Sequence, residues 1–235
     1  FTKDPVSRAG FLFTWRWTNR NRGFRMRVYP TIGYVVVWII LMVVNRSGEV
    51  NGSIANAASA PYAILMLIYL SSFITINAMQ HVAATDEYKA AWIFYTYPVE
   101  KPGSVIRGSF ISLLSKFYLP IGLLLLVGGL LWKGPAIIPN MIFGLSNQLA
   151  ICCCILLINK KSLPASRPLE MKDRGGSFLK SMLMLMITGT IGVVHFMVYK
   201  FTAVIILLAL LSLLANWLLL KRIGEIGWRE IKELT

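Results

Sequence analysis

Long apolar stretches alternate with shorter polar segments along this chain, and six of them are long enough to cross a membrane. A helix needs about 20 predominantly apolar residues to span the hydrocarbon core of a bilayer, which is roughly 30 Å thick. The six stretches occupy residues 29–45, 54–80, 110–132, 136–159, 178–199 and 202–220. This pattern predicts an all-α fold, in which a polytopic domain over residues 29–221 contains six transmembrane helices.

Only Lys200 and Phe201 separate the last two apolar stretches. A single helix through both would be about 63 Å long at 1.5 Å per residue, roughly twice the thickness of the hydrocarbon core. We therefore expect a tight hairpin of two helices, which either cross the membrane fully or form a re-entrant pair.

Composition and charge support a membrane location and give the chain an orientation. Hydrophobic residues make up 56% of the chain and charged residues 14%, with a mean hydropathy of +0.64. Soluble domains contain about 25% charged residues, so this class is excluded. If the six stretches span in turn, 21 of the 24 Lys and Arg residues fall on one side, and only Arg46, Lys133 and Lys200 on the other. The positive-inside rule then predicts cytoplasmic termini and cytoplasmic loops at 81–109 and 160–177.

Basic segments flank the membrane domain at both ends of the chain. Residues 1–28 interleave aromatic residues with Arg in FLFTWRWTNRNRGFRMR, directly before the first span. An amphipathic helix at the membrane interface explains this mixture more simply than a stacking platform for nucleic acid. We therefore expect contact with membrane lipids and no nucleic-acid partner. The tail, residues 222–235, places Ile223, Ile226, Trp228 and Ile231 among charged residues, which predicts a short surface helix.

A few polar side chains within the apolar stretches are the candidates for an interior role. They are Asn77, Asn147, Gln148, His195 and Asn216. Such groups either hydrogen-bond between helices or line a substrate pathway, and the sequence leaves both alternatives open.

The sequence contains no motif that anchors a catalytic interpretation. It has no HExxH, no phosphate-binding loop and no recognisable triad of nucleophile, base and acid. Cys152, Cys153 and Cys154 are consecutive, so on a helix they point about 100° apart and do not converge on one metal ion. We therefore expect no catalytic residues, no metal and no cofactor.

The loop between the second and third spans is the one place where acidic, aromatic, basic, Pro and Gly residues occur together. From Asp86 to Tyr97 the loop has neither Gly nor Pro. Tyr88, Ala91, Trp92 and Tyr95 recur at the spacing of one helical face, Asp86 and Glu87 favour the amino-terminal end, and Pro98 ends the run. This pattern predicts a short amphipathic helix outside the membrane.

That order of features resembles the first intracellular loop of ABC transporter permeases of the type-2 exporter class. In the resemblance, DEYKAAWIFYTYP corresponds to the coupling helix, EKPGSVIRG to the exit from the loop, and Lys116 to a basic group inside the third span. The patterns VYPTIGY, AAWIFYTYPVEKPG and a loop with LPAS are similar to those of an uncharacterised bacterial group of ABC exporter permeases.

The resemblance implies a permease subunit in the bacterial cytoplasmic (inner) membrane that couples a separate ABC-type ATPase to substrate translocation. ATP hydrolysis would then occur on the partner, and two permease halves would form a homodimer or a heterodimer. The residues expected to dock on the ATPase are Asp86, Glu87, Tyr88, Trp92, Tyr95 and Pro98. The alternative, favoured by the scarcity of charge inside the spans, is a non-transporting structural or assembly subunit of a membrane complex.

Overall fold

The computed structural model describes residues 4–45, 60–96, 99–159, 161–168 and 174–231. Within these ranges the regular secondary structure is helical, and β-pairing is limited to two isolated bridges. The prediction of an all-α fold is therefore confirmed.

Five helical segments among the described residues are long and apolar enough to cross a membrane. They are Arg22–Leu41, Ala63–His81, Gly103–Leu131, Pro135–Ile158 and Thr202–Gly224. They belong in turn to α2 (Arg22–Asn45), α4 (Ala60–His81), α6 (Gly103–Leu113) continuing into α7 (Leu119–Lys133), α8 (Ile138–Ile158) and α10 (Thr202–Gly224). These helices are those of a multi-pass membrane protein.

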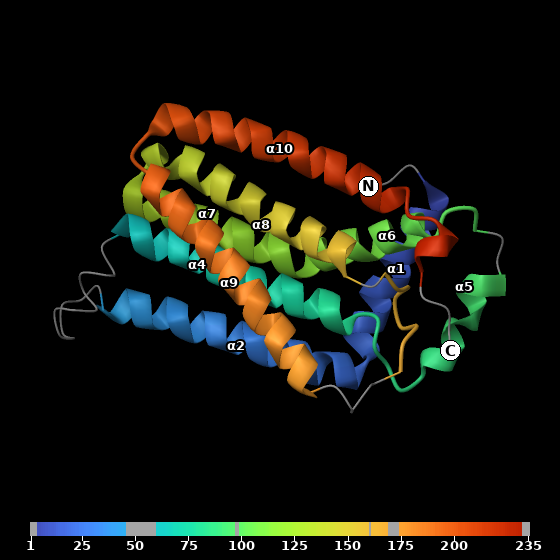
Figure 1. Cartoon of the computed structure of the whole chain (residues 1–235). Coiled ribbons are helices and arrows are strands. Elements are labelled where there is room, and N and C mark those ends of the chain that lie inside the picture. The colour runs from blue at the N-terminus through green and yellow to red at the C-terminus, as the bar shows by residue number, and fades with distance from the viewer. Residues whose placement is uncertain (1–3, 46–59, 97–98, 160, 169–173, 232–235) are drawn as a thin grey trace.

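The fifth predicted span corresponds to α9 (Arg174–Val198). The apolar stretch found within its described residues, Met182–Val198, is shorter than the other five segments. A turn after Val198 leads directly into α10, so α9 and α10 form the expected hairpin (Figure 1).

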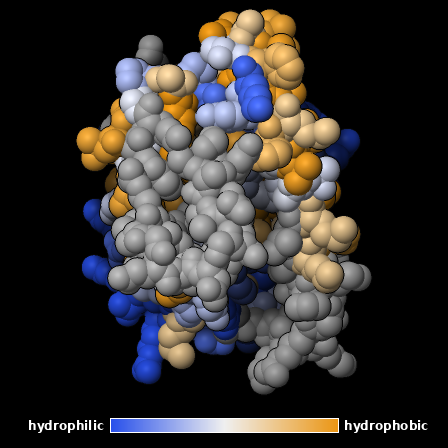
Figure 2. Space-filling view, turned by 90° about the vertical axis from the view of Figure 1, so that its left-hand side faces the viewer, coloured by the Kyte–Doolittle hydropathy of each residue, from blue (hydrophilic) through white to orange (hydrophobic). Residues whose placement is uncertain are grey.

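The spans pack into one bundle with α4 near its centre (Figure 1). On α4, Ile68, Ser72 and Ile74 are fully buried. On α10, in contrast, Leu207, Leu210 and other large apolar side chains are more than half exposed. Figure 2, which looks at the bundle from the left of Figure 1, shows hydrophobic residues at the surface on this α10 side, at the top of the view. Such a surface is suited to the hydrocarbon region of a membrane.

The third span is longer than predicted and is interrupted by a π-helical turn. The helix begins at Gly103 instead of residue 110, because Val105, Ile106 and Phe110 are already buried. The π turn, η2 (Leu114–Tyr118), carries Lys116, whose ammonium donates to Thr18 Oγ1 at 3.0 Å and to Asn19 Oδ1 at 2.6 Å. Lys116 therefore joins this span to the amino-terminal helix.

The amino-terminal helix, α1 (Pro5–Arg20), packs closely along α6. It begins with Asp4, whose carboxylate accepts from Val6 N at 3.0 Å, and its buried stripe consists of small residues: Ser7, Gly10, Thr14 and Thr18. A Cβ at Gly10 would lie 2.6 Å from the Val105 carbonyl oxygen, and one at Gly108 would overlap the Ser7 carbonyl. These glycines allow the two backbones to approach closely.

A second helix begins within the predicted interfacial segment. Asn21 separates α1 from α2, and its side-chain oxygen accepts from Phe24 N at 2.7 Å, which caps the start of α2. Residues 22–28 therefore belong to the first spanning helix, and α1 alone supplies the flanking element.

Four segments that are distant in sequence gather at one end of the bundle, the right-hand side of Figure 1. They are α1, the loop between α4 and α6, residues 161–167 and the tail after α10. Residues 161–167 run beside the start of the first loop: Ala165 N donates to Val82 O at 2.9 Å, Arg167 N to Ala83 O at 2.8 Å, and Thr85 N to Arg167 O at 2.9 Å.

The prediction of a surface helix in the tail is wrong over the described residues. The helix α10 ends at Gly224, and the chain turns into a short 3₁₀ segment, η4 (Trp228–Glu230). Ile223, Ile226 and Ile231 are at most 6% exposed and join the core cluster that includes Phe110 and Leu163. The isoleucines are therefore buried against the first loop and residues 161–167, and they do not form one face of a surface helix.

Candidate functional site

The predicted loop helix is short and changes its winding partway. Residues Tyr88–Trp92 form a 3₁₀ segment, η1, and Ile93–Thr96 form one α-helical turn, α5. In 3₁₀ winding, residues three apart lie on the same side. Tyr88, Ala91 and Phe94 accordingly face the protein, with Ala91 3% exposed and the two aromatic residues half-buried. The prediction that Trp92 shares this face is wrong.

Trp92 and its neighbour Ile93 instead face away from the bundle. Trp92 is 60% exposed and Ile93 55% exposed. Asp86 and Glu87, the expected charged rim, are also exposed and precede η1. Ile93 was missed because it lies off the face that a regular α-helix would present. Pro98, the expected end of the docking segment, lies outside the described residues.

Aromatic contacts anchor the inward side of this segment to both ends of the chain. Phe94 meets Phe13 of α1 edge to face, with ring centroids 5.2 Å apart. Tyr95 packs against Trp228 of the tail, with centroids 5.5 Å apart. Tyr95, predicted to dock on a partner, is therefore half-buried within this chain.

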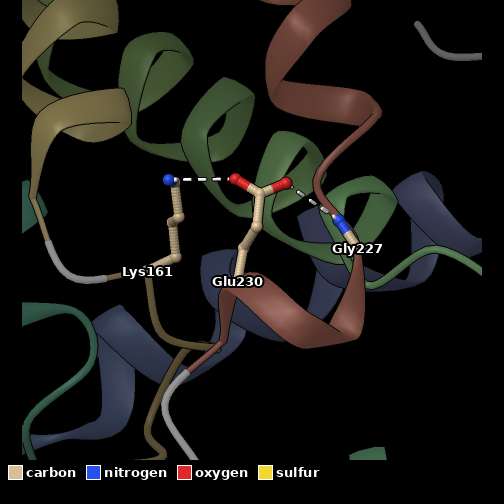
Figure 3. A network of polar contacts seen from close by, with 3 residues as sticks. All are labelled: Lys161, Gly227 and Glu230. Atoms are coloured by element: carbon tan, nitrogen blue, oxygen red, sulfur yellow. Dashed lines mark hydrogen bonds and ion pairs between the residues drawn. The ribbon is translucent and has the colours of Figure 1, made fainter.

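The tail is fastened in turn to the two loops. Gly103 N donates to Ile226 O at 3.0 Å, which ties the tail to the first turn of α6. Lys161 forms an ion pair with Glu230 at 3.0 Å, and the other carboxylate oxygen of Glu230 accepts from Gly227 N at 3.4 Å (Figure 3). The hydrogen bond from Lys161 lowers the pKa of the Glu230 carboxyl from its ordinary value.

Leu163–Ser166, the LPAS pattern, makes the turn that places residues 161–167 against the first loop. Leu163 is fully buried, and Ser166 Oγ donates to the Leu163 carbonyl at 2.7 Å. Ala165 adopts φ of 54°, in the left-handed region that non-glycine residues occupy sparingly. The pattern thus has a structural explanation as a tight, buried turn.

Inside the bundle, two of the predicted polar residues belong to one hydrogen-bonded chain. The Tyr69 hydroxyl lies 2.9 Å from His195 Nδ1 and accepts from Asn147 Nδ2 at 3.3 Å. The chain continues from His195 Nε2 to Asn140 Oδ1 at 3.3 Å and from Asn147 Oδ1 to Ser212 Oγ at 3.2 Å. It connects α4, α8, α9 and α10.

Close packing surrounds the pair of Tyr69 and His195. Phe143 meets the His195 ring with centroids 4.6 Å apart. A Cβ at Gly192 would lie 3.1 Å from the Tyr69 ring, and one at Gly144 would lie 3.4 Å from His195 Cε1. The sequence offered no signal for Tyr69, because it stands alone within an apolar stretch.

The other three polar candidates also bond between helices. Asn77 donates to Arg27 O at 3.0 Å and to Thr31 Oγ1 at 2.7 Å, which fastens α4 to α2. Gln148 donates to Ser71 Oγ at 3.3 Å, and Asn216 donates to the carbonyl and hydroxyl oxygens of Ser146 at 2.8 and 2.9 Å. Of the two alternatives, the geometry favours hydrogen bonding between helices.

The described residues contain no group of three or more His, Cys, Asp or Glu side chains able to hold a metal ion. No family model, no curated protein and no solved structure matches the chain. The candidate site is therefore the anchored segment around Trp92, which exposes an aromatic and an aliphatic side chain at the surface.

Proposed function

We propose that the chain is the transmembrane subunit of an ATP-driven exporter, similar to type-2 ABC permeases, and that residues 86–96 dock on a separate ATPase subunit. The observation that carries this proposal is the two-sided character of the segment. Trp92 and Ile93 are exposed, while Phe94 and Tyr95 hold the same segment to α1 and to the tail. Trp is one of the residues most enriched among those that dominate binding near the centre of protein interfaces.

The anchors give the segment a route for transmitting movement. A displacement of Trp92 reaches α1 through Phe94 and Phe13, and it reaches α10 through Tyr95 and Trp228. From α1 it passes to the third span, because Gly10 and Gly108 keep α1 and α6 in close contact. Closure of an ATPase against Trp92 would thus move α1 and tilt the third and last spans.

The topology follows from the charge distribution. In this proposal α9 is the fifth of six spans, both termini are cytoplasmic, and the end that carries α1, the two loops and the tail faces the cytoplasm of a bacterium. The gathering of these four segments at one end supports that arrangement. Two copies, or this chain and a related half, would enclose the path between them.

The experiment is affinity purification of the tagged chain from membranes of its own host, followed by identification of the proteins that accompany it. The proposal predicts an ATP-binding subunit in stoichiometric amount. Repeated purification without such a subunit, under conditions that keep membrane complexes intact, would contradict it.

One observation favours a second candidate, the structural or assembly subunit of a membrane complex. The polar residues Asn77, Asn147, Gln148, His195 and Asn216 all bond between helices of the same chain. A subunit without a transport path needs interior groups for packing alone. The same purification distinguishes the candidates, because this one predicts only membrane partners that do not bind ATP.

A further inference from the structure

A basic cleft lies between α1 and the start of the first loop. It has a volume of about 690 Å³, and its lining includes Arg16, Arg20 and Arg22, with Trp17 and Leu12 beside them and Glu87 as the acidic member. The cleft is separate from the outward face of Trp92 and Ile93, neither of which lines it. Glu87 belongs both to the cleft and to the proposed docking segment, whereas Trp92 and Ile93 belong to the docking segment alone.

The three arginines form no ion pair with an acidic side chain among the described residues. The ion pair found among the described residues joins Lys161 to Glu230 and involves none of them. All three are exposed, so the lining combines three guanidinium groups with one carboxylate. Guanidinium groups bind phosphate oxygens with paired hydrogen bonds, and three converging on one cleft suit a phosphate group.

The surroundings of the cleft indicate which class of phosphate-bearing molecule would fit it. Leu12 and Trp15 are 41% and 37% exposed on the same helix as Arg16 and Arg20, and α2, the first span, begins directly after Asn21. Exposed apolar and aromatic side chains beside Arg, next to a span, are typical of a helix at the membrane interface. A nucleic acid would leave Leu12 without an apolar environment.

We propose that this cleft binds the phosphate headgroup of an anionic membrane phospholipid. Arg16, Arg20 and Arg22 hold the phosphate, and Leu12 lies beside the glycerol and the first methylenes of the acyl chains. The bound lipid sits between α1 and Glu87, at the start of the segment that carries Trp92. Glu87 opposes the phosphate, so its charge weakens the site.

The test uses native mass spectrometry of the purified full chain, with dioctanoyl phosphatidylglycerol as the probe and dioctanoyl phosphatidylcholine as its zwitterionic counterpart. The variant R16Q/R20Q/R22Q removes the three cleft charges. Its matched control, R8Q/K89Q/R229Q, removes three exposed charges that do not line the cleft. Each cationic side chain contributes about fivefold to binding of an anionic headgroup, so loss of all three should weaken phosphatidylglycerol binding by roughly a hundredfold. The control should bind within about twofold of the unaltered chain.

Two single variants still test the proposal if the triple variant fails to fold. R20Q should weaken phosphatidylglycerol binding by roughly fivefold, and E87Q should strengthen it. The proposal is overturned if the two lipids bind equally or if both triple variants lose binding equally. It is also overturned if inorganic phosphate displaces phosphatidylglycerol at matched concentration. Stronger binding of a short RNA than of phosphatidylglycerol would overturn it as well.

Discussion

The indole nitrogen of Trp228 donates a hydrogen bond of 2.7 Å to the carbonyl oxygen of Val99. Residues 129 positions apart in sequence are thus joined at the end of the bundle where the first loop, residues 161–167 and the tail meet. The same indole ring packs against Tyr95. Trp228 is therefore the residue through which the tail holds the segment that carries Trp92.

Replacing Trp228 should loosen this junction in two steps. W228F keeps a ring against Tyr95 but loses the hydrogen bond, which should lower the free energy of unfolding by about 1 kcal/mol. W228A also loses the half-buried ring and should cost roughly 2–3 kcal/mol. Thermal unfolding in detergent measures both. The control W217F changes an indole that is 61% exposed and should have little effect.

The contact between α1 and α6 should not tolerate a side chain at Gly108. G108A places a methyl group against the Ser7 carbonyl and 2.9 Å from Phe11 N, so α1 must shift. Overpacking of this kind costs about 1–3 kcal/mol. G128A is the matched control, because a Cβ at that position would point into open space. Equal unfolding temperatures for the two variants would refute the close contact.

The hydroxyl of Tyr69 should contribute to stability and not to a transport path. Y69F leaves His195 Nδ1 and Asn147 Nδ2 without their partner, at a cost of about 0.5–2 kcal/mol. The control is Y34F, since the Tyr34 side chain is 70% exposed. A Y69F variant with unchanged stability but impaired export would instead assign Tyr69 to the pathway.

The ion pair of Lys161 and Glu230 should make the order of the tail depend on pH. Lys161 lowers the pKa of Glu230 in the folded state. The pair therefore stabilises the folded tail fully above the carboxyl's unfolded pKa of about 4.3. This contribution disappears as the pH falls through the lower pKa of the folded state. Hydrogen exchange of the tail should therefore be slower in the unaltered chain than in E230Q near neutral pH and equal to it in strong acid.

The matched control for that comparison is E225Q. Glu225 is exposed and takes no part in the ion pair found among the described residues. Its replacement should leave tail exchange unchanged at every pH. If E225Q and E230Q alter exchange equally, net charge and not the contact with Lys161 is responsible.

Five of the six predicted spans correspond to helices long and apolar enough to cross a membrane, and they could be predicted because a long apolar stretch distinguishes such a helix. Their ends could not, since tertiary contacts decide them: the third span starts at Gly103 because Val105 and Ile106 are buried by α1 and the tail. The spacing of the small residues in α1 indicates its packing face, because it brings them onto one side of the helix. They are Ser7, Gly10, Thr14 and Thr18.

The candidate site could be located from the sequence, but its outward face could not. Position and composition identified residues 86–96, whereas the face depends on the winding of η1, which turns Trp92 outward and Tyr88 inward. The aromatic anchors, Phe13 and Trp228, come from the two ends of the chain, and no local pattern pairs them with Phe94 and Tyr95. Tyr69 was missed for the same reason, because its partner His195 lies 126 residues away.

The central claim is that the outward face of residues 86–96 docks on an ATPase. The most direct measurement is the ATPase activity of the co-purifying ATP-binding subunit after reconstitution with this chain. The variants W92A/I93A and W217A are compared with the unaltered chain. Trp92 and Trp217 are 60% and 61% exposed, so the control removes an equally exposed indole from the exposed apolar side of α10. We predict that W92A/I93A weakens the complex at least tenfold, which corresponds to about 1.4 kcal/mol, and reduces stimulation accordingly, while W217A does neither. Full stimulation by W92A/I93A would contradict the claim.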